Sequence, residues 1–469
     1  MKDQIRRTVI ALLLAASHLS AATLYVSVDS TNATPPYTNW ATAATTIHQA
    51  VGVAAAGDAV VVTNGVYPGG VPVTNALALR SVNGPQFTVI DGGGQSAGQT
   101  CVSLSDGASL TGFTLRNGLV GVSATQNAVI TNCTLTGCGY GWGHGAVGGT
   151  LYGCTFFQNY APFGGGASGC TLYNCTLSYN SAQFGAGASQ CMLYNCTLSW
   201  NSAVGLWENG QFTAAWGGGA EHCTLYNCTV TDNTTTGTGG GVIFSALHNC
   251  IVYYNNIGFN PNEVSNYGYW TGPIDYCCTT PPPFGGTGNI GNEPLLVDHV
   301  NGDLHLLSNS PCINAGYNAY VTNTTDLDGN SRIMSGTVDI GAYEYKGTGS
   351  RISYAWLQQY VLPMDGSADF IDSDHDGLNN WQEWVCGTDP TNPQSVLSLI
   401  SATPTSTNAT VTWMSVAGVN YFLECRTNPG SPFTLLATNI VGQAGTTSYA
   451  DTNATGATPF FYRVGVTAP

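Results

Sequence analysis

The sequence predicts an all-β protein: a parallel β-helix solenoid, then a small helix-loop-helix calcium segment, then a β-sandwich. Three observations predict this order: a repeat of about 21 residues between 130 and 252, an acidic loop at 372–383, and alternating strand patterns after 396. Of the 469 residues, 43% are hydrophobic and 8% are charged. The chain therefore has enough apolar surface to offset the entropy lost on folding, with little help from ion pairs.

Residues 1–22 have the pattern of a secretion signal. Three basic side chains lie before an apolar run from Thr8 to Ala16, and small residues at 20–22 mark a cleavage site. No later segment is long enough to span a bilayer. We expect a secreted protein that is extracellular or held at the cell surface.

The charge of the remaining chain excludes one class of partner. The signal contains 3 of the 10 basic and 1 of the 26 acidic residues, which leaves 7 against 25 and a net charge of −18. A protein that binds duplex nucleic acid needs the opposite sign. We therefore expect no nucleic-acid partner, and the excess of carboxylates favours cation binding.

The region from 130 to 252 repeats a β-rich tetrad. Its cysteines advance by 21, 21, 21, 32 and 22 residues, and the long step holds an insertion at about 206–216. A unit of this length cannot bury its apolar side alone, so neighbouring units must stack. The period is too short for helical repeats or a propeller blade, and the spacing of leucine-rich repeats is missing. The remaining interpretation is a parallel β-helix with one coil per unit. The tetrads begin at Asn132, Gly153, Asn174, Asn195, Asn227 and Asn249.

Alternation within a coil predicts which side chains point inward. In the stretch 170–173, Cys and Leu share one side, and Thr and Tyr share the other. Stacking in register then gives inner columns of Cys, Leu and Asn. The 16 cysteines of a secreted chain permit disulfides. Parallel neighbours point their Cβ vectors the same way, however, which strains a bridge, so we favour buried free thiols.

These residues resemble the right-handed parallel β-helix superfamily that includes pectate lyases, polygalacturonases and phage tailspikes. The stretch 46–67 is similar to the capping helix and first coil of that superfamily, and 156–167 is similar to the repeats of polymorphic outer-membrane adhesins. Residues 301–344 are similar to the choice-of-anchor Q module, which follows β-helix repeats in secreted bacterial proteins. The resemblance implies a right-handed parallel β-helix over 23–345, closed by a C-terminal capping segment.

An acidic loop follows a short linker at 346–350 and a segment with helical spacing at 352–362. Residues 372–383 fit the pattern D-x-D-x-D-G-x5-E in every specified position. Three carboxylates, a backbone carbonyl and a bidentate glutamate supply the oxygen ligands that Ca²⁺ prefers, and Gly377 permits the sharp turn. The predicted ligands are Asp372, Asp374, Asp376, Leu378 through its carbonyl, Asn380 and Glu383.

Two features distinguish this loop from a paired EF-hand. Asn379 stands where paired EF-hands usually have an apolar residue, and 387–390 is similar to thrombospondin type 3 and dockerin-like calcium repeats, in which Asp389 could add a ligand. The alternative is an acidic loop without an ion. We expect 351–395 to form a structural calcium segment that stiffens a hinge.

From 396 to 469 the pattern changes to alternating strands at 409–413, 421–425, 433–437 and 460–466. The length and strand spacing resemble a compact fibronectin III-like sandwich. Such modules commonly bind a partner or separate other domains.

Catalytic residues are sparse in the coils. Lyases of the superfamily use an Arg or Lys base, and neither residue type occurs between Arg116 and Arg332. Hydrolases need two carboxylates that flank the scissile bond. Glu221 and Asp232 fall in one coil, but the alternative is two solvated turn residues. Gly143-His144-Gly145 copies one polygalacturonase motif without its companions, so we interpret it as coincidence. We name no catalytic residue.

An outward aromatic column is the stronger functional candidate. Exposed rings stacked one per coil often mark a binding site, and flat rings suit sugar faces. The alternative is a ladder stabilised by its own ring contacts. The insertion adds two tryptophans on a loop that leaves one coil. The candidate ligand-binding residues are Tyr152, Tyr173, Tyr194, Tyr226, Trp207 and Trp216.

The sequence therefore favours an adhesin-like protein that binds carbohydrate or another surface and holds a structural Ca²⁺. The first alternative is a polysaccharide lyase or glycoside hydrolase. The second is a non-catalytic structural spacer.

Overall fold

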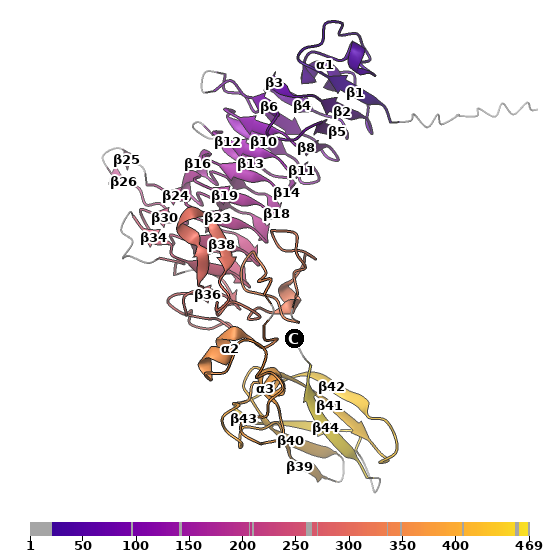
Figure 1. The fold of residues 1–469 in the computed structure, drawn as a ribbon, viewed down its shortest axis with the longest axis vertical. Coiled ribbons are helices and arrows are strands. Elements are labelled where there is room, and N and C mark those ends of the chain that lie inside the picture. The colour runs from indigo at the N-terminus through magenta and orange to yellow at the C-terminus, as the bar shows by residue number, and fades with distance from the viewer. Residues whose placement is uncertain are drawn as a thin grey trace, which may run out of the picture.

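The computed structural model describes residues 21–94, 97–139, 143–205, 207–208, 211–258, 265–269, 271–334, 336–347, 349–405, 408–454 and 459–467, with the backbone alone at 207–208 and 211–212. Most of the predicted signal, residues 1–20, lies outside these ranges. The described chain forms a stack of coils followed by two small sheets (Figure 1). The predicted fold class is confirmed as a parallel β-helix followed by small antiparallel sheets.

Four sheets run along the coils, and their strands pair in parallel. The first sheet contains β1 (Thr23–Val26), β2 (Ala59–Val62), β5 (Ala78–Ser81), β8 (Ser109–Thr111), β11 (Val129–Thr131), β14 (Thr150–Tyr152), β18 (Thr171–Tyr173), β22 (Met192–Tyr194), β28 (Thr224–Tyr226), β32 (Ala246–His248) and β35 (Ile274–Asp275). The second contains β3 (Gly65–Pro68), β6 (Thr88–Asp91), β9 (Thr114–Arg116), β12 (Thr134–Thr136), β15 (Thr155–Phe157), β19 (Thr176–Ser178), β23 (Thr197–Ser199), β29 (Thr229–Thr231), β33 (Ile251–Tyr253) and β36 (Cys278–Thr279).

The other two sheets complete each coil. The third contains β4 (Val71–Val73), β7 (Val102–Leu104), β10 (Val120–Ala124), β13 (His144–Val147), β17 (Ala167–Ser168), β21 (Ala188–Ser189), β27 (Ala220–Glu221) and β31 (Val242–Ile243). The fourth contains β16 (Tyr160–Phe163), β20 (Ser181–Phe184), β24 (Ser202–Ala203), β30 (Thr234–Thr235) and β34 (Asn256–Ile257). Leu151, Leu172, Leu193 and Leu225 lie opposite one another in consecutive strands, so one sequence repeat is one coil.

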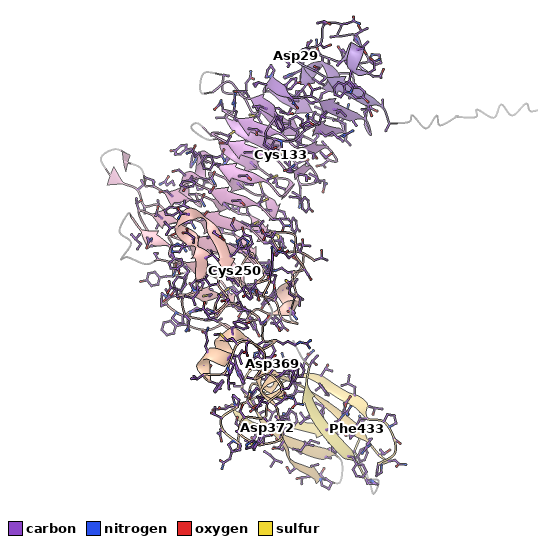
Figure 2. All side chains as sticks on the ribbon, viewed as in Figure 1. Asp29, Cys133, Cys250, Asp369, Asp372 and Phe433 are labelled. Carbon is purple, nitrogen blue, oxygen red and sulfur yellow. The ribbon has the colours of Figure 1, made fainter. Side chains whose placement is uncertain are left out.

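Buried columns fill the coils, as the alternation predicts. The leucines of the first sheet are fully buried, and a column of cysteines lies beside them. From Cys154 to Cys250, each cysteine N–H in this column donates to the Sγ of the cysteine in the next coil, for example from Cys175 to Cys196 at 3.4 Å. All 16 cysteines are free, and Cys425 alone is partly exposed. Figure 2 labels Cys133 and Cys250, which lie in an earlier and a later coil.

A ladder of buried asparagines fixes the turn that leads into the fourth sheet. The N–H of Asn180 donates to Asn201 Oδ1 at 3.0 Å, and its Nδ2 donates to the same oxygen and to the carbonyl of Phe156. Because these buried amides are satisfied by the neighbouring coils, they stabilise the stacking register. The same chain of bonds joins Asn159, Asn180, Asn201, Asn233, Asn255 and Asn266.

Short elements cover the two ends of the coil stack. At the N-terminal end, α1 (Ile47–Val51) begins with a capping box between Thr46 and Gln49 and buries its apolar residues. At the other end, the segment 296–345 includes a hairpin of β37 (Leu296–Asp298) and β38 (Asp303–Leu306). Its carbonyls at 317, 320 and 325 accept hydrogen bonds from side-chain amides at the edge of the first sheet. This is the region where the sequence places the capping segment.

The C-terminal part contains two short helices and two three-stranded antiparallel sheets. The helices are α2 (Tyr354–Gln359) and α3 (Asn380–Cys386). One sheet contains β39 (Leu399–Pro404), β40 (Ala409–Ser415) and β43 (Gly445–Asp451), and the other contains β42 (Thr434–Val441), β41 (Asn420–Arg426) and β44 (Phe461–Val466). Val411, Trp413, Tyr421 and Leu423 form the core between them. The sequence analysis had not identified β39 or β43, because their exposed positions hide the alternation.

No helix of the described ranges has the length and apolar character of a membrane span.

Candidate binding surface and metal site

The predicted tyrosine column forms a stack along the first sheet. Ring centroids lie 4.9 Å apart between Tyr152 and Tyr173, 4.7 Å between Tyr173 and Tyr194, and 5.2 Å between Tyr194 and Tyr226, with interplanar angles below 10°. His248 continues the stack from the next coil at 4.9 Å. Each inner ring therefore turns its faces toward its neighbours and its edge outward.

The capping segment covers one end of this stack. The ring of Tyr320 lies 4.3 Å from that of His248 and 6.2 Å from that of Tyr226. Tyr194 is only 9% exposed, whereas Tyr152, at the open end, is 42% exposed. The inner tyrosines therefore fit the alternative interpretation, a ladder stabilised by its own ring contacts. Only Tyr152, among these four tyrosines, is exposed enough for a ligand to reach its ring.

A second aromatic row lies along the fourth sheet and was not identified from the sequence. Phe163 and Phe184 are paired residues of neighbouring coils, with ring centroids 5.1 Å apart. Trp216 follows in the next coil, 5.2 Å from Phe184 and tilted by 55°. Phe163 and Trp216 are 44% and 37% exposed. The signal in the sequence was the recurrence of an aromatic residue directly before a glycine run, at 163, 184 and 216.

Trp216 thus belongs to a coil, although the sequence analysis placed it in the insertion. It forms parallel bridges to Phe184 and Thr238. The other predicted tryptophan, Trp207, lies in β25 (Trp207–Glu208), which pairs in antiparallel fashion with β26 (Gln211–Phe212). Its side chain lies outside the described residues. The described part of the insertion therefore pairs as a small hairpin. It precedes Trp216, the last member of the aromatic row, in the chain.

A polar network adjoins the Trp216 end of this row. Ser189 Oγ donates to Glu221 Oε2 at 2.8 Å, and His222 Nδ1 lies 2.5 Å from Glu221 Oε1. The imidazole of His222 stacks on Phe244 at 4.7 Å, and Phe244 lies 6.1 Å from Trp216. Glu221 is buried, while the His222 side chain is half exposed. Aromatic and hydrogen-bonding groups therefore meet on one part of the surface.

Glu221 and Asp232 do not share a site, because the coil places them on different sheets. Glu221 lies in β27 of the third sheet, whereas Asp232 follows β29 of the second. The carboxylate of Asp232 contacts His299 Nδ1 at 3.0 Å, and burial raises the pKa of Asp232. Both residues are buried and bonded, so the expectation of two solvated turn residues is wrong.

The acidic loop folds around the side chain of Asp372. The N–H groups of His375 and Gly377 donate to its two carboxylate oxygens at 2.7 and 3.0 Å. Gly377 adopts a φ of 98°, which only glycine adopts readily, although space for a side chain exists there. Carboxylate oxygens of Asp372, Asp374 and Asp376 lie within 4.8 Å of one another. This partly buried triad could hold a metal ion.

Helix α3 contains Asn380 and Glu383, the other two predicted side-chain ligands of the ion. Asn380 and Glu383 lie in its first turn and are fully buried. Asn379 is the N-cap: its side chain accepts from the N–H of Gln382, and the Gln382 side chain accepts from the N–H of Asn379. This capping box explains why a polar residue stands where paired EF-hands have an apolar one.

Four buried oxygens of the loop accept no hydrogen bond: Asp374 Oδ2, Asp376 Oδ2, Asn380 Oδ1 and Glu383 Oε2. Buried acceptors without a donor are rare in folded proteins. Burial, together with the charges of Asp374 and Asp376, raises the pKa of Glu383 to about 7. Oxygen donors that lack hydrogen bonds and repel one another fit a hard cation. Asp389 is different, because its Oδ1 already accepts from the N–H and the hydroxyl of Thr391.

The loop lies where the coils meet the C-terminal sheets (Figure 2). On the coil side, Asp369 accepts from Ser350 Oγ at 2.5 Å and from the N–H of Arg351 at 3.0 Å. Trp381 and Trp384 pack against the apolar cluster that includes residues of β37, β38 and α2. A change in the loop therefore acts directly on the packing at the end of the coil stack.

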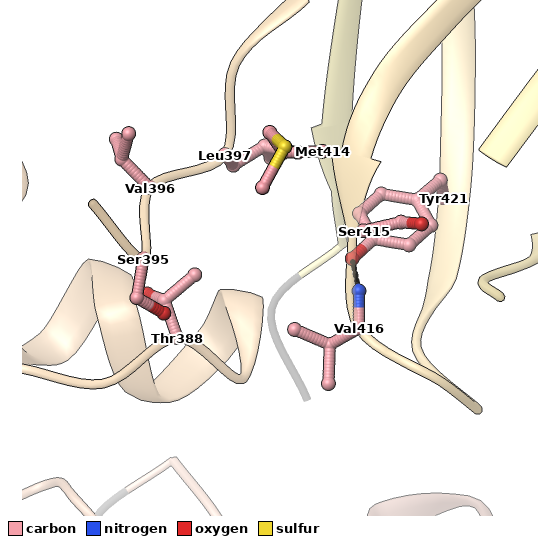
Figure 3. A pocket seen from close by; sticks show the side chains of 8 residues that line it. All are labelled: Thr388, Ser395, Val396, Leu397, Met414, Ser415, Val416 and Tyr421. Atoms are coloured by element: carbon pink, nitrogen blue, oxygen red, sulfur yellow. Dashed lines mark hydrogen bonds between the residues drawn. The ribbon is translucent and has the colours of Figure 1, made fainter. Parts of the chain in front are cut away.

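On the other side, the chain after α3 packs against the first C-terminal sheet. A small cavity of about 50 Å³ separates Thr388 and Ser395 from Met414, Ser415 and Tyr421 (Figure 3). The Tyr421 hydroxyl accepts from the N–H of Val416 at 2.9 Å. The cavity is too small for an organic ligand and belongs to the joint between the loop and the sheets.

Comparisons with known proteins gave similar folds at low identity. No family model matches the chain, and no curated protein matches it. A crystal structure of the pectate lyase Pel9A aligns with a TM-score of 0.45 and 13% identity over 70% of this chain and 98% of that chain. A rhamnogalacturonan lyase aligns with a TM-score of 0.33 and 11% identity over 59% of this chain and 91% of that chain. A pectin methylesterase in complex with a hexasaccharide aligns with a TM-score of 0.32 and 13% identity over 61% of this chain and 99% of that chain.

The parallel β-helix is established by the strand pairings of this chain, and scores of this size add no argument about its activity. The choice-of-anchor Q type, the calcium-repeat type and the fibronectin III-like type stay predictions.

Proposed function

We propose that the protein is a secreted or cell-surface β-helix that binds a polysaccharide along its coils and holds a structural Ca²⁺ at the joint with its C-terminal sheets. One observation carries the binding part: the exposed aromatic row of Phe163, Phe184 and Trp216 meets the hydrogen-bonding network of Glu221 and His222.

The chemistry of this surface suits a sugar polymer. Aromatic rings pack against the C–H faces of pyranose rings, and carboxylate, imidazole and hydroxyl groups bind sugar hydroxyls. The coils repeat at about 4.8 Å, which is close to the length of one sugar unit in an extended chain. Trp216 is tilted relative to Phe184, so it offers more ring surface to a ligand than the parallel inner tyrosines do.

Affinity electrophoresis through gels that contain neutral and acidic polysaccharides tests the binding surface. We expect retention of the wild type by at least one polymer, and a dissociation constant roughly tenfold higher for Trp216→Ala, because a central aromatic contact contributes about 1.4 kcal/mol or more. Trp40→Ala is the matched control, since Trp40 is 46% exposed and lies beside β1 at the other end of the stack. Equal retention of the two variants would contradict the assignment of the surface.

The same polymers should be followed for new reducing ends and for the absorbance of unsaturated products. If the wild type cleaves a polymer and Glu221→Gln does not, the protein is a lyase or glycosidase and not a binding protein. Neither retention nor turnover would favour the structural spacer.

The calcium part of the proposal is supported by the unsatisfied oxygens of the loop. Asp372, Asp374, Asp376, Asn380 and Glu383 would bind the ion through side chains, and Leu378 through its carbonyl. The ion would neutralise the repulsion among the carboxylates and fix α3 to the loop. Because α3 and its flanking residues contact both the coil end and the C-terminal sheets, we expect the ion to stiffen the joint between them.

A further inference from the structure

We propose a second binding site on the outer face of the sheet β42-β41-β44, which recognises a polysaccharide that carries carboxylates. Its centre is Phe433, whose ring is contacted by two guanidinium groups. The Cζ of Arg426 lies 4.4 Å from the ring centroid, and the Cζ of Arg463 lies 4.6 Å from it. Figure 2 labels Phe433 on the C-terminal sheets, away from the coils.

The register of the strands places these groups on one face. Tyr421 and Leu423 point into the core, so Glu424 and Arg426 point outward from the same strand. In the neighbouring strand, Arg463 lies opposite Glu424, and Phe461 lies opposite Arg426. The outer face therefore presents two guanidinium groups, one carboxylate and two aromatic rings.

The charge of this face is unusual for the chain. Only 7 basic residues follow the predicted signal, and two of them meet at Phe433. Arg463 forms an ion pair with Glu424, which leaves one positive charge in excess. In contrast, Arg116 and Lys346 are each paired with an aspartate, and Arg332 is buried. An acidic polymer is repelled by most of this surface and attracted here.

The arrangement favours specific binding of a carboxylate over nonspecific attraction of an anion. A guanidinium that lies over a ring can still pair with a carboxylate through N–H groups in its own plane. Arg463 uses its Nε–H on Glu424 and Arg426 uses one terminal nitrogen on Ser431, so the other terminal N–H groups would bind the ligand. Arg426 also contacts Phe461 at 5.8 Å and donates to the carbonyl of Ser431, so its position is set before a ligand arrives. The exposed side chains of Phe461 and Leu435 offer apolar contact to sugar rings beside the charges.

The test compares binding of a polyuronate and a neutral polymer by the full chain at low salt. In Arg426→Gln/Arg463→Gln we expect polyuronate affinity to fall at least tenfold, because charge-assisted hydrogen bonds are lost, and neutral-polymer binding to stay unchanged. The double variant Arg80→Gln/Lys346→Gln removes the same charge elsewhere and should bind as the wild type does. If the first double variant does not fold, Arg463→Gln alone serves, since the Arg463 side chain is 58% exposed.

Each outcome decides the proposal. Equal losses in both double variants would indicate a general charge effect, and an unchanged affinity in the first would contradict the site. No polyuronate binding by the wild type at low salt would also overturn it. The arginine site and the coil surface can be tested separately. The arginine substitutions should lower polyuronate affinity by the same factor in Trp216→Ala as in the wild type.

Discussion

Replacing Asp374 with asparagine should have opposite effects on stability with and without a bound Ca²⁺. Without the ion, the substitution removes one of the crowded carboxylates, whose pKa is raised by burial and by repulsion from Asp376 and Asp372. With the ion, the same substitution removes a charged ligand. The variant should therefore be as stable as the wild type or more stable in chelator, and less stable in Ca²⁺.

The size of the effect follows from the buried oxygens. Four acceptors without donors, at about 1 kcal/mol each at the low end, give about 4 kcal/mol that a bound ion would recover. Mass action gives a similar value of about 4.1 kcal/mol when the free ion exceeds its Kd about 1,000-fold. A C-terminal part of this size should then melt on the order of 10 °C higher in saturating Ca²⁺.

Calorimetry in Ca²⁺ and in chelator measures this shift. The control is Asp365→Asn, the same chemical change at an exposed aspartate outside the loop, whose carboxylate only accepts from Ser367. We expect the control to keep the full calcium shift and Asp374→Asn to lose most of it. A wild-type melting temperature that is the same in Ca²⁺ and in chelator would contradict the proposed calcium site.

Three further predictions concern the stability of the coils and their cap. Asn201→Ala should lower the free energy of unfolding by about 3 kcal/mol in urea titration, because it leaves buried partners in two coils unsatisfied, whereas exposed Asn83→Ala should change it little. The pKa values of Asp339 and Glu344 are raised to about 6 and about 9, chiefly by burial, so the stabilising protons are held at low pH and lost as the pH rises through these values. The urea midpoint should therefore fall from about pH 4, where both carboxyls begin to ionise in the unfolded chain, to about pH 9, and Glu344→Gln should remove the part of that decline above about pH 6. A thiol reagent should label Cys425 first and the 15 buried cysteines only after unfolding; fast labelling of the column would contradict the packing.

The sequence predicted the coil stack well because its signal is periodic and local. Recurring Cys, Leu and Asn at one step per coil leave a single way to stack, and the structure confirms those columns. The acidic triad was also predicted, because its three aspartates lie within a motif of twelve consecutive residues. Features that depend on contacts between distant segments were not accessible in this way.

Two such contacts and the insertion give the surface features that the sequence does not predict. Tyr320 from the capping segment packs on His248 and Tyr226 at one end of the tyrosine stack, a contact that no local pattern shows. Glu221 and Asp232 lie on different sheets, and Asp232 contacts His299 from the segment after the coils. The row ending in Trp216 was hidden because the insertion shifts that residue out of the regular step.

A structure of the protein with a bound oligosaccharide from the polymer that retains it tests the binding proposal most directly. The proposal predicts that a sugar ring lies on Trp216 or Phe184, with its hydroxyls in contact with Glu221 or His222. A ligand bound elsewhere on the coils, with that row free, would contradict it.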